Sequence, residues 1–288
     1  MGFESSSATL PSADPGTLPR RAKYRIRFSK SGSLRLVSHH DLMHCFERML
    51  RRASLPLCTT QGFHPQPRMI FAQSLALGIA GLNEVVELEL NDILPAEEVH
   101  TRLIQQAPPG MVFLNTRVID FKAGAQVRRA FYRLEIPPSP LLPFSLSSAV
   151  EKLLLSTEKW VDRTRPRPRR FNLRPYVSQL TFRAPLLEMA LWVTPNGAVR
   201  PEEVARLLGL ETLLADGAFF ERTFLELYDE LPPDDPERMP ACLLERIPAE
   251  PAPKTDKAGQ AFQPDKTERA PRLEDSLLHP ALFSEEEN

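Results

Sequence analysis

Three histidines stand close together in the sequence, where they could bind a metal ion or move a proton. His40 and His44 are four residues apart, so both fall on one side of a helix, and His64 could add a third ligand from the turn that follows. The zincin pattern H-E-x-x-H is absent, because Asp41 follows His40 and Met43 precedes His44. A histidine here could also act as a general base, but the sequence alone assigns it no serine or cysteine nucleophile. A polar pair without a metal is the favoured interpretation.

Arginines are the clearest candidates for binding a phosphate backbone. Six of them stand in the segment 163–174, RTRPRPRRFNLR, whose prolines prevent a helix. Extended guanidinium groups suit phosphate contact, and a solvated linker is an equally good interpretation of the same composition. The basic-loop candidates in this segment are Arg165, Arg167, Arg169 and Arg170. Further arginines that could line a groove for RNA are Arg25, Arg27, Arg35, Arg48, Arg51, Arg52 and Arg68.

RNA-binding modules on mixed folds commonly stack bases on aromatic side chains of a sheet. Tyr24 and Phe28 are the candidates here, in an alternating segment that predicts a half-buried strand. The RNP1 pattern is absent. The sequence G-I-A-G at 78–81 resembles a KH loop only superficially, because it does not lie between two predicted helices. Base stacking is therefore a hypothesis without a motif behind it.

The element that must position most of these groups is a helix predicted between Ser38 and Ser54. Ser38 is the expected N-cap, with Asp41 three residues later in a variant of the capping box. Pro56 prevents the helix from continuing. Apolar residues recur on one side at helical spacing: Leu42, Cys45, Phe46, Met49, Leu50 and Ala53. The opposite side carries histidines and arginines.

The order of predicted elements indicates an α+β fold. Residues 21–122 give a strand, the capped helix, two strands, a helix that begins with Pro95, and a strand, which is the ferredoxin-like βαββαβ order. Residues 123–230 repeat it, with strands predicted at 126–136, 177–182, 186–193 and 218–228 and helices at 146–156 and 200–208. We therefore predict two tandem ferredoxin-like units.

Both ends of the chain differ from this body in composition. Residues 1–20 are rich in serine, proline and alanine, and residues 231–288 combine many prolines with 13 acidic and 7 basic side chains. Such segments bury too little apolar surface to fold, so we predict two disordered tails, the second acidic and proline-rich. Cys45, Cys58 and Cys242 form no C-x-x-C pair, and no apolar run approaches the ~20 residues of a membrane span. We expect a cytoplasmic protein without disulfides.

The stretch 38–90 resembles the signature of a radical-SAM-linked protein family of unknown function. The pattern is S-H-x-D-L, then F-E-R with R-R-A, then Q-G-F-x-P-x-P, and then L-x-L-G-x-x-G/S-x-x-E. The matching residues are Ser38, His39, Asp41, Leu42, Phe46, Glu47, Arg48, Arg51, Arg52, Ala53, Gln61, Gly62, Phe63, Pro65, Pro67, Leu75, Leu77, Gly78 and Glu84. Further similarity in LRPYVSQL and GAVRPEEVARLLGL extends the match over about residues 23–228. The family's histidine is then His39, which weakens the metal hypothesis for His40 and His44.

The resemblance implies a partner protein, but it does not imply a reaction that this chain catalyses. Members of this family are encoded beside a radical SAM enzyme or fused to one, and that partner is expected to carry a [4Fe–4S] cluster and S-adenosylmethionine. This chain lacks the C-x-x-x-C-x-x-C pattern that holds such a cluster, so it is not the radical enzyme, and no cofactor is expected in it.

We therefore expect a non-catalytic accessory protein that binds the substrate of its radical SAM enzyme through a basic cleft, with RNA as the candidate substrate and no role for a membrane. No catalytic residue is assigned. The candidate binding or structural residues are Ser38, His39, Asp41, Arg48, Arg51, Arg52, Gln61, Gly62, Phe63, Pro65, Pro67, Arg68, Gly78 and Glu84.

Two alternatives from other classes stay open. The first is a stand-alone RNA-processing or RNA-modifying enzyme with His39 or His64 as general base. Tandem ferredoxin-like units also build the CRISPR repeat-processing endoribonucleases, which is an analogy of fold alone. The second is a scaffold for protein interactions, which predicts an exposed apolar patch.

Overall fold

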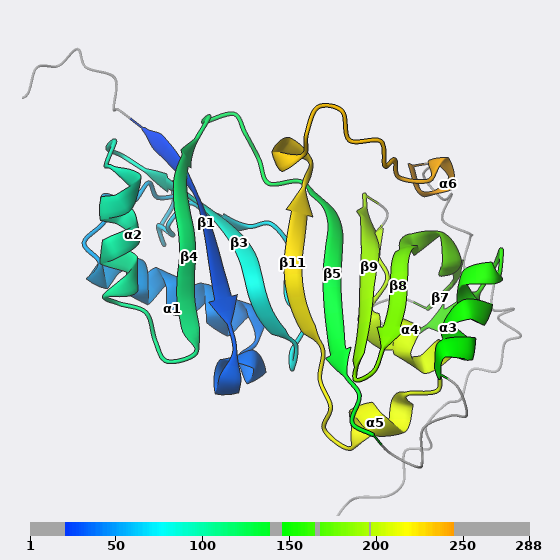
Figure 1. Ribbon diagram of the computed structural model, residues 1–288. Coiled ribbons are helices and arrows are strands. Elements are labelled where there is room, and N and C mark those ends of the chain that lie inside the picture. Colours follow the sequence, from blue (N-terminus) through cyan, green and yellow to red (C-terminus); the bar gives the residue numbers. More distant parts are fainter. Residues whose placement is uncertain (1–20, 139–145, 165–167, 196, 245–288) are drawn as a thin grey trace, which may run out of the picture. The chain divides into compact units, whose positions relative to one another are not determined.

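The computed structural model describes residues 21–138, 146–164, 168–195 and 197–244 (Figure 1). All of these belong to one compact unit, which ends at Ile247. The predicted tail at 1–20 and most of the predicted tail at 231–288 lie outside the described residues.

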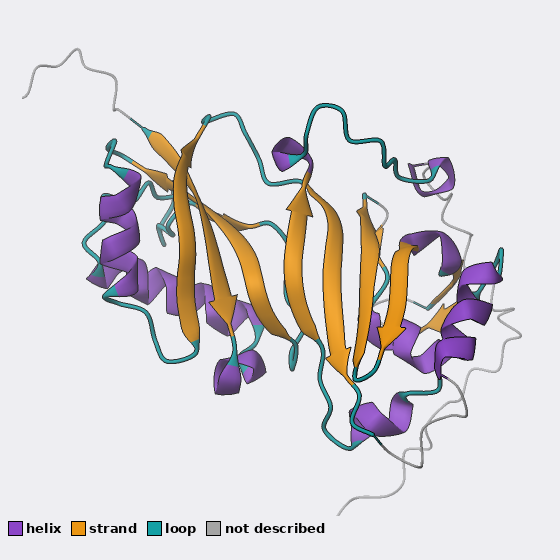
Figure 2. Ribbon diagram, viewed as in Figure 1, coloured by secondary structure: helices purple, strands orange, loops and turns teal. Residues whose placement is uncertain are grey.

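One mixed sheet runs through this unit, in the order β10-β9-β5-β11-β3-β1-β4, with β2 paired to β3 and β8 paired to β9 (Figure 2). Its strands are β1 Ala22–Lys30, β2 Met69–Phe71, β3 Ala80–Leu90, β4 Met111–Ile119, β5 Val127–Glu135, β8 Val177–Arg183, β9 Leu186–Thr194, β10 Gly197–Ala198 and β11 Glu221–Leu227. A separate pair is formed by β6 Trp160–Arg163 and β7 Arg169–Asn172. The helical segments are η1 Gly32–Leu36, α1 His39–Arg52, α2 Ala96–Ile104, α3 Leu146–Leu155, η2 Arg174–Tyr176, α4 Pro201–Leu207, α5 Glu211–Ala215, η3 Tyr228–Glu230 and α6 Ala241–Leu244.

The predicted α+β class is confirmed, and the predicted strands and helices of both halves are present. Two details were not predicted. The second strand of the first half is short, three residues at Met69–Phe71. The arginine-rich segment 163–174, predicted to be an extended loop, instead contributes to the β6–β7 hairpin and to η2.

Helix α1 begins where its sequence predicts. The Ser38 side chain accepts a hydrogen bond from the Asp41 amide at 3.2 Å and donates to the Asp41 carboxylate at 2.6 Å. This satisfies one of the amides that every helix leaves unpaired in its first turn. The apolar side of the helix buries Leu42, Phe46, Met49 and Leu50 against the sheet.

Strand β1 shows why the aromatic residues proposed for stacking are unavailable. Its alternation turns Tyr24, Ile26 and Phe28 toward the core beneath α1, and both aromatic residues are 0% exposed. The Phe28 ring contacts that of Phe46, with centroids 5.0 Å apart, and the Tyr24 hydroxyl donates to the Leu94 carbonyl at 2.8 Å. The prediction that these rings could stack on RNA bases is therefore wrong, because the helices cover that face.

The last strand joins the two halves of the sheet. β11 lies between β5 and β3, and its first residues run parallel to the start of β3, with Glu221 opposite Ala80 and Arg222 opposite Gly81. The Ala80 amide donates to the Phe220 carbonyl at 3.1 Å across this joint. The sheet is therefore continuous between the two halves.

The chain stays folded past the predicted boundary at residue 230. Asp235 forms an ion pair with Arg128 at 3.0 Å, and Glu237 forms one with Arg129. Leu243 of α6 is buried in the core of the second half. The prediction of one disordered tail from residue 231 is thus wrong for residues 231–244, because their carboxylates neutralise buried arginines of β5. No helix in the described ranges has the length and apolar character needed to cross a membrane.

Candidate functional site

A buried ion pair joins the two halves of the sheet. Arg222 of β11 donates from Nε to Glu84 Oε1 of β3 at 2.8 Å and from Nη2 to Glu84 Oε2. The two residues are 2% and 3% exposed. The remaining Arg222 donors reach the backbone carbonyls of Ser74 and Gln73, at 3.1 and 3.2 Å. The guanidinium is therefore satisfied on every side by the loop that precedes β3 and by Glu84.

The electrostatics of this pair follow from its burial. Burial alone would lower the pKa of the Arg222 guanidinium, but the Glu84 carboxylate and the Tyr132 hydroxyl raise that pKa above its usual value. Burial raises the pKa of the Tyr132 hydroxyl of β5, and the positive charge of Arg222 opposes this shift. Three strands, β3, β5 and β11, thus contribute one group each to a single buried network.

Gly81 explains part of the signature spacing G-x-x-G-x-x-E. A Cβ at Gly81 would lie 2.5 Å from Glu84 Cγ, closer than non-bonded carbon atoms approach. With glycine here, the Glu84 side chain can fold back toward Arg222 without having to shift. Gly78, three residues earlier, has a φ of +87°, in the region that glycine adopts without strain. The two glycines therefore have structural roles: Gly78 adopts a positive φ in the loop before β3, and Gly81 leaves space for the Glu84 side chain.

His39, at the start of α1, lies beside the same network. Its ring packs edge-on against Phe71, with centroids 5.3 Å apart. Burial lowers the pKa of His39, and the positive charges of Lys30 and Arg222 lower it further against the opposing effect of Glu84. Because the usual value is 6.5, His39 is neutral at physiological pH.

Lys30, at the end of β1, is a second buried cation near this site. It is 0% exposed, and its Nζ donates to the Val37 carbonyl at 2.6 Å. Burial lowers its pKa, and Arg222 also lowers it, while Glu84 raises it. Lys30, Tyr132 and Arg222 are members of this buried network that sequence reasoning missed. The available signal was Arg222 itself, a charge two positions after the apolar Phe220 in a segment predicted to close the sheet.

The other histidines lie apart from this network. The His40 and His44 rings meet edge-on, with centroids 4.4 Å apart, and His44 Nδ1 lies 3.2 Å from Glu47 Oε2. His64 is exposed in the turn. Among the described residues, no cluster of three or more histidine, cysteine, aspartate or glutamate side chains is arranged to hold a metal.

The exposed side of α1 and the turn that follows it form a second candidate surface, which we call the α1–turn surface. It comprises Arg48, Arg51, Gln61, Gly62, Phe63, His64 and Pro65, all exposed. Phe63 is 102% exposed relative to a free residue, so its ring stands entirely in solvent. Neither Arg48 nor Arg51 forms an ion pair with any residue that the structure describes.

The base of this turn is held in place. The Thr60 amide donates to the Gln66 carbonyl at 2.9 Å, and Thr59 pairs with the buried Pro67. With its amide nitrogen turned toward α1, Gln66 donates to Glu47 at 3.0 Å. Arg51 stands one helical turn after Glu47, so the turn lies on the side of α1 that carries Arg51.

Several arginines predicted to line an RNA groove are engaged within the protein. Arg25 is 1% exposed and bonds Glu87 and Asp229 at 2.8 and 2.7 Å. Arg27 pairs with Glu230. A cleft of about 530 Å³ at this place is therefore lined by arginines and carboxylates together, not by a positive surface. The groove hypothesis is wrong for β1, because its arginines face acidic groups from β3 and η3.

The remaining predicted arginines differ in their surroundings. Arg52 donates to the Gln106 side chain at 3.2 Å, and Arg68 lies 3.5 Å from Glu89. Arg169 lies over the Phe171 ring and Arg170 over the Trp160 ring, at 4.7 and 5.8 Å from the centroids.

Other arginines of the basic segment bind within the fold. Arg163 pairs with the buried Glu203 at 2.6 Å, and Arg174 donates to the Leu154 carbonyl at 2.9 Å. Arg165 and Arg167 lie outside the described residues.

Comparison with known proteins places the sequence in a family. A family model described as an uncharacterized protein conserved in bacteria (DUF2344) matches residues 23–201. The chain belongs to this family. The DUF2344 match includes α1, its turn, Gly78 and Glu84. It therefore covers the α1–turn surface and the buried network, except for Arg222. The family description states no activity, and it does not mention a radical SAM enzyme.

No curated protein matches the sequence. Among solved structures, the chain is similar to the crystal structure of an unknown protein from Galdieria sulphuraria, at 13% identity over 72% of this chain and 99% of that chain, with a TM-score of 0.24. At that score the likeness carries no argument about fold or function.

The burial of the Glu84–Arg222 pair predicts that two similar substitutions lower the free energy of unfolding by different amounts. Glu84→Gln leaves the Arg222 guanidinium without its counter-charge in the core, so it should lower the free energy of unfolding by about 3–5 kcal/mol. Glu221→Gln removes the neighbouring and more exposed partner of Arg133, so it should cost at most about 1 kcal/mol. Urea unfolding followed by circular dichroism measures both. Equal losses in the two variants would contradict the account.

The pKa of His39 predicts a pH dependence. Since the folded state lowers this pKa below 6.5, the unfolded chain binds the proton more readily. The contribution of His39 is therefore fully present above about pH 6.5 and is lost as the pH falls through the lowered pKa. NMR titration of the His39 ring, assigned by its loss in His39→Gln, should give a midpoint below 6.5. A midpoint at or above that value would contradict the placement of His39 beside Lys30 and Arg222.

Proposed function

We propose that this chain is a non-catalytic accessory protein that works beside a radical SAM enzyme and binds that enzyme's substrate, an RNA, through the α1–turn surface. The observations that carry the proposal are the exposure of Arg48 and Arg51 on α1, neither ion-paired with a described residue, and the fully exposed Phe63 ring in the turn that Gln66 joins to Glu47 of α1. The radical SAM partner is supported by the sequence signature, and it would supply the [4Fe–4S] cluster and S-adenosylmethionine.

Charge is the first reason to choose this surface. A folded protein neutralises most buried arginines with its own carboxylates, as Arg25 and Arg222 illustrate. Arg48 and Arg51 instead keep their donors available in solvent. Guanidinium groups in that state can each contact two phosphate oxygens.

The exposed ring is the second reason. Single-stranded nucleic acids bind where a positive surface adjoins aromatic rings, because every base has a flat face that can stack. Phe63 stands at the tip of a turn whose base is fixed by Thr60 and Gln66. Because its ring is fully exposed, Phe63 contributes little to the stability of the fold.

The surroundings of the signature residues favour binding over catalysis. Ser38 caps α1, and Glu84 neutralises Arg222, so structural roles account for the presence of both residues in the signature. His39 is the residue that favours the rival proposal, an RNA-processing or RNA-modifying enzyme, because a neutral imidazole is in the right state for a general base. Its ring, however, packs on Phe71. We therefore place His39 in the scaffold.

We further propose that each half of the sheet is a ferredoxin-like unit. The first half pairs its strands in the order β4-β1-β3-β2, and the second in the order β11-β5-β9-β8, with antiparallel neighbours in both. This supports the tandem arrangement that the order of elements predicts. The three cysteines are free thiols, which supports a place in the cytoplasm beside the enzyme.

Binding of a single-stranded RNA across a salt series tests this function. The double variant Arg48→Ala/Arg51→Ala should bind more weakly, and the slope of log affinity against log salt should flatten by about 1.4, since each lost phosphate contact on a single strand contributes about 0.7. Phe63→Ala should weaken binding while leaving the slope unchanged, because stacking releases no counterions.

The matched control is Arg183→Ala/Arg206→Ala, which removes two exposed arginines from β8 and α4 of the second half. It should behave as the wild type. Absence of binding at low salt, or an equal loss in both double variants, would refute RNA binding by the α1–turn surface.

A further inference from the structure

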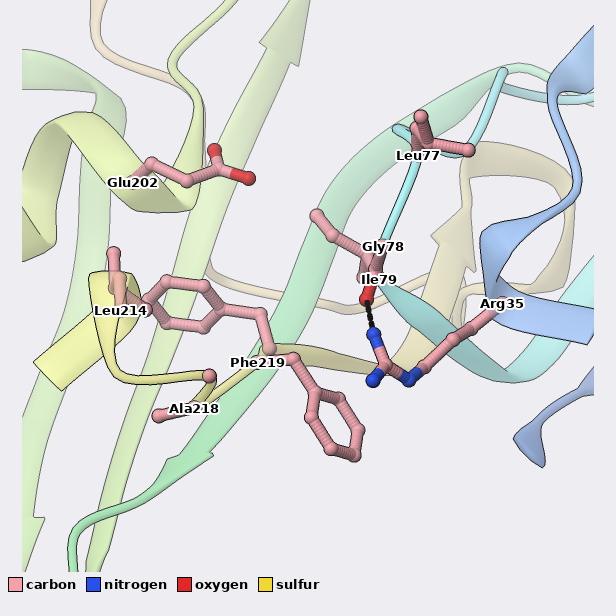
Figure 3. A pocket seen from close by; sticks show the side chains of 10 residues that line it. Arg35, Leu77, Gly78, Ile79, Glu202, Leu214, Ala218 and Phe219 are labelled. Atoms are coloured by element: carbon pink, nitrogen blue, oxygen red, sulfur yellow. Dashed lines mark hydrogen bonds between the residues drawn. The ribbon is translucent and has the colours of Figure 1, made fainter. Parts of the chain in front are cut away.

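A cavity of about 270 Å³ lies where η1, the loop before β3, and the α4–α5 region meet (Figure 3). Arg35 and Gly78 form one wall, and Glu202, Leu214 and Phe219 form others. Its lining combines residues from both halves of the sheet. It is separate from the α1–turn surface, because no residue of that surface lines it.

One wall of the cavity is fixed by Arg35. Its Nη1 donates to the Gly78 carbonyl at 3.2 Å, and the Gly78 amide donates to the Arg35 carbonyl at 3.0 Å. The same guanidinium lies over the Phe219 ring, 4.2 Å from its centroid. These contacts hold the Arg35 side chain against Gly78 and Phe219, so this wall of the cavity forms without a ligand.

The apolar walls leave a ring-binding surface open to solvent. Phe219 is 40% exposed and Leu77 is 65% exposed, although both line a concave site. Ile79 and Leu214 complete the apolar lining. Exposed apolar side chains that converge on a cavity are typical of sites for small organic ligands.

Glu202 gives the cavity its polarity. Figure 3 shows its carboxylate pointing from α4 into the space opposite Ile79. Its neighbour Glu203 pairs with Arg163, at 2.6 Å, whereas within the described residues no cation forms an ion pair with Glu202. Burial raises the pKa of the Glu202 carboxyl, and the charge of Glu203 adds to this, against its own backbone amide and Arg200. A partly buried carboxylate without a counter-charge favours a cation from outside.

We propose that this cavity binds a small aromatic amine, with its ring against Phe219, Leu214 and Ile79 and its ammonium group on the Glu202 carboxylate. An ammonium group would pair with Glu202, which forms no ion pair with any residue in the described ranges, and a flat ring matches the apolar walls. A carboxylate in the position of the ammonium group would instead be repelled by Glu202, whose carboxylate faces the space opposite Ile79. The site requires no RNA and so goes beyond the proposed function.

The probe is tryptamine, and its matched control is indole-3-propionate, which keeps the indole ring and replaces the ammonium group with a carboxylate. Binding to the full chain is followed by NMR, through the amide resonances of Gly78 and Gly217 in the lining. Tryptamine should shift these resonances saturably at millimolar concentration or below. Indole-3-propionate should bind at least about tenfold more weakly, the factor that a charge-assisted hydrogen bond supplies.

Three variants test the position of the ligand in the cavity. Glu202→Gln should weaken tryptamine binding by about tenfold or more, whereas Glu211→Gln, an exposed residue of α5, should leave it unchanged. Ala218→Leu adds bulk to the lining and should abolish binding by a route that does not involve charge. No saturable shift with tryptamine, equal binding of indole-3-propionate, or unchanged binding by Glu202→Gln or Ala218→Leu would each overturn the proposal.

Discussion

A buried guanidinium group without a carboxylate partner costs several kcal/mol, on the order of 3–5, and this constraint organises the structure around Arg222 and Glu84. Arg222 belongs to the last strand of the second half, and Glu84 belongs to the first half, so this buried ion pair forms only where the two halves meet. Gly81 provides the space in which Glu84 turns back, and the carbonyls of Gln73 and Ser74 accept the remaining donors. The short parallel pairing of β11 with β3 is thus reinforced by side chains that have no alternative partner.

This arrangement changes how the family signature is understood. A motif dense in histidine, arginine, glutamate and glycine suggests chemistry, but much of this one builds the scaffold. Ser38 caps a helix, and Gly78 shapes the loop before β3. Once these roles are assigned, Arg48, Arg51 and Phe63 stand out because the fold does not use them. Residues that a protein leaves exposed and unpaired inside a signature are the ones best placed to contact a partner.

The sequence predicted what depends on neighbouring residues and missed what depends on distant ones. The helix from Ser38 was predictable because its cap and its apolar spacing are local. The ion pairs of Arg25 were not predictable, because its partners Glu87 and Asp229 are 62 and 204 residues away in the sequence. The alternation of β1 showed two faces without indicating which one the helices cover, so Tyr24 and Phe28 were candidates for base stacking, whereas the structure buries both in the core. The cavity beside Glu202 was likewise invisible, because segments far apart in the chain form it.

The most direct test of the central claim is a double-mutant cycle between Glu84→Gln and Arg222→Met, measured by equilibrium unfolding. If the pair couples the two halves, the double variant should be more stable than the sum of the single losses predicts, with an interaction energy of about 2–3 kcal/mol, because neither charge is then left buried alone. Effects that add to within about 0.5 kcal/mol would contradict the account, since they would show that the two side chains do not depend on each other.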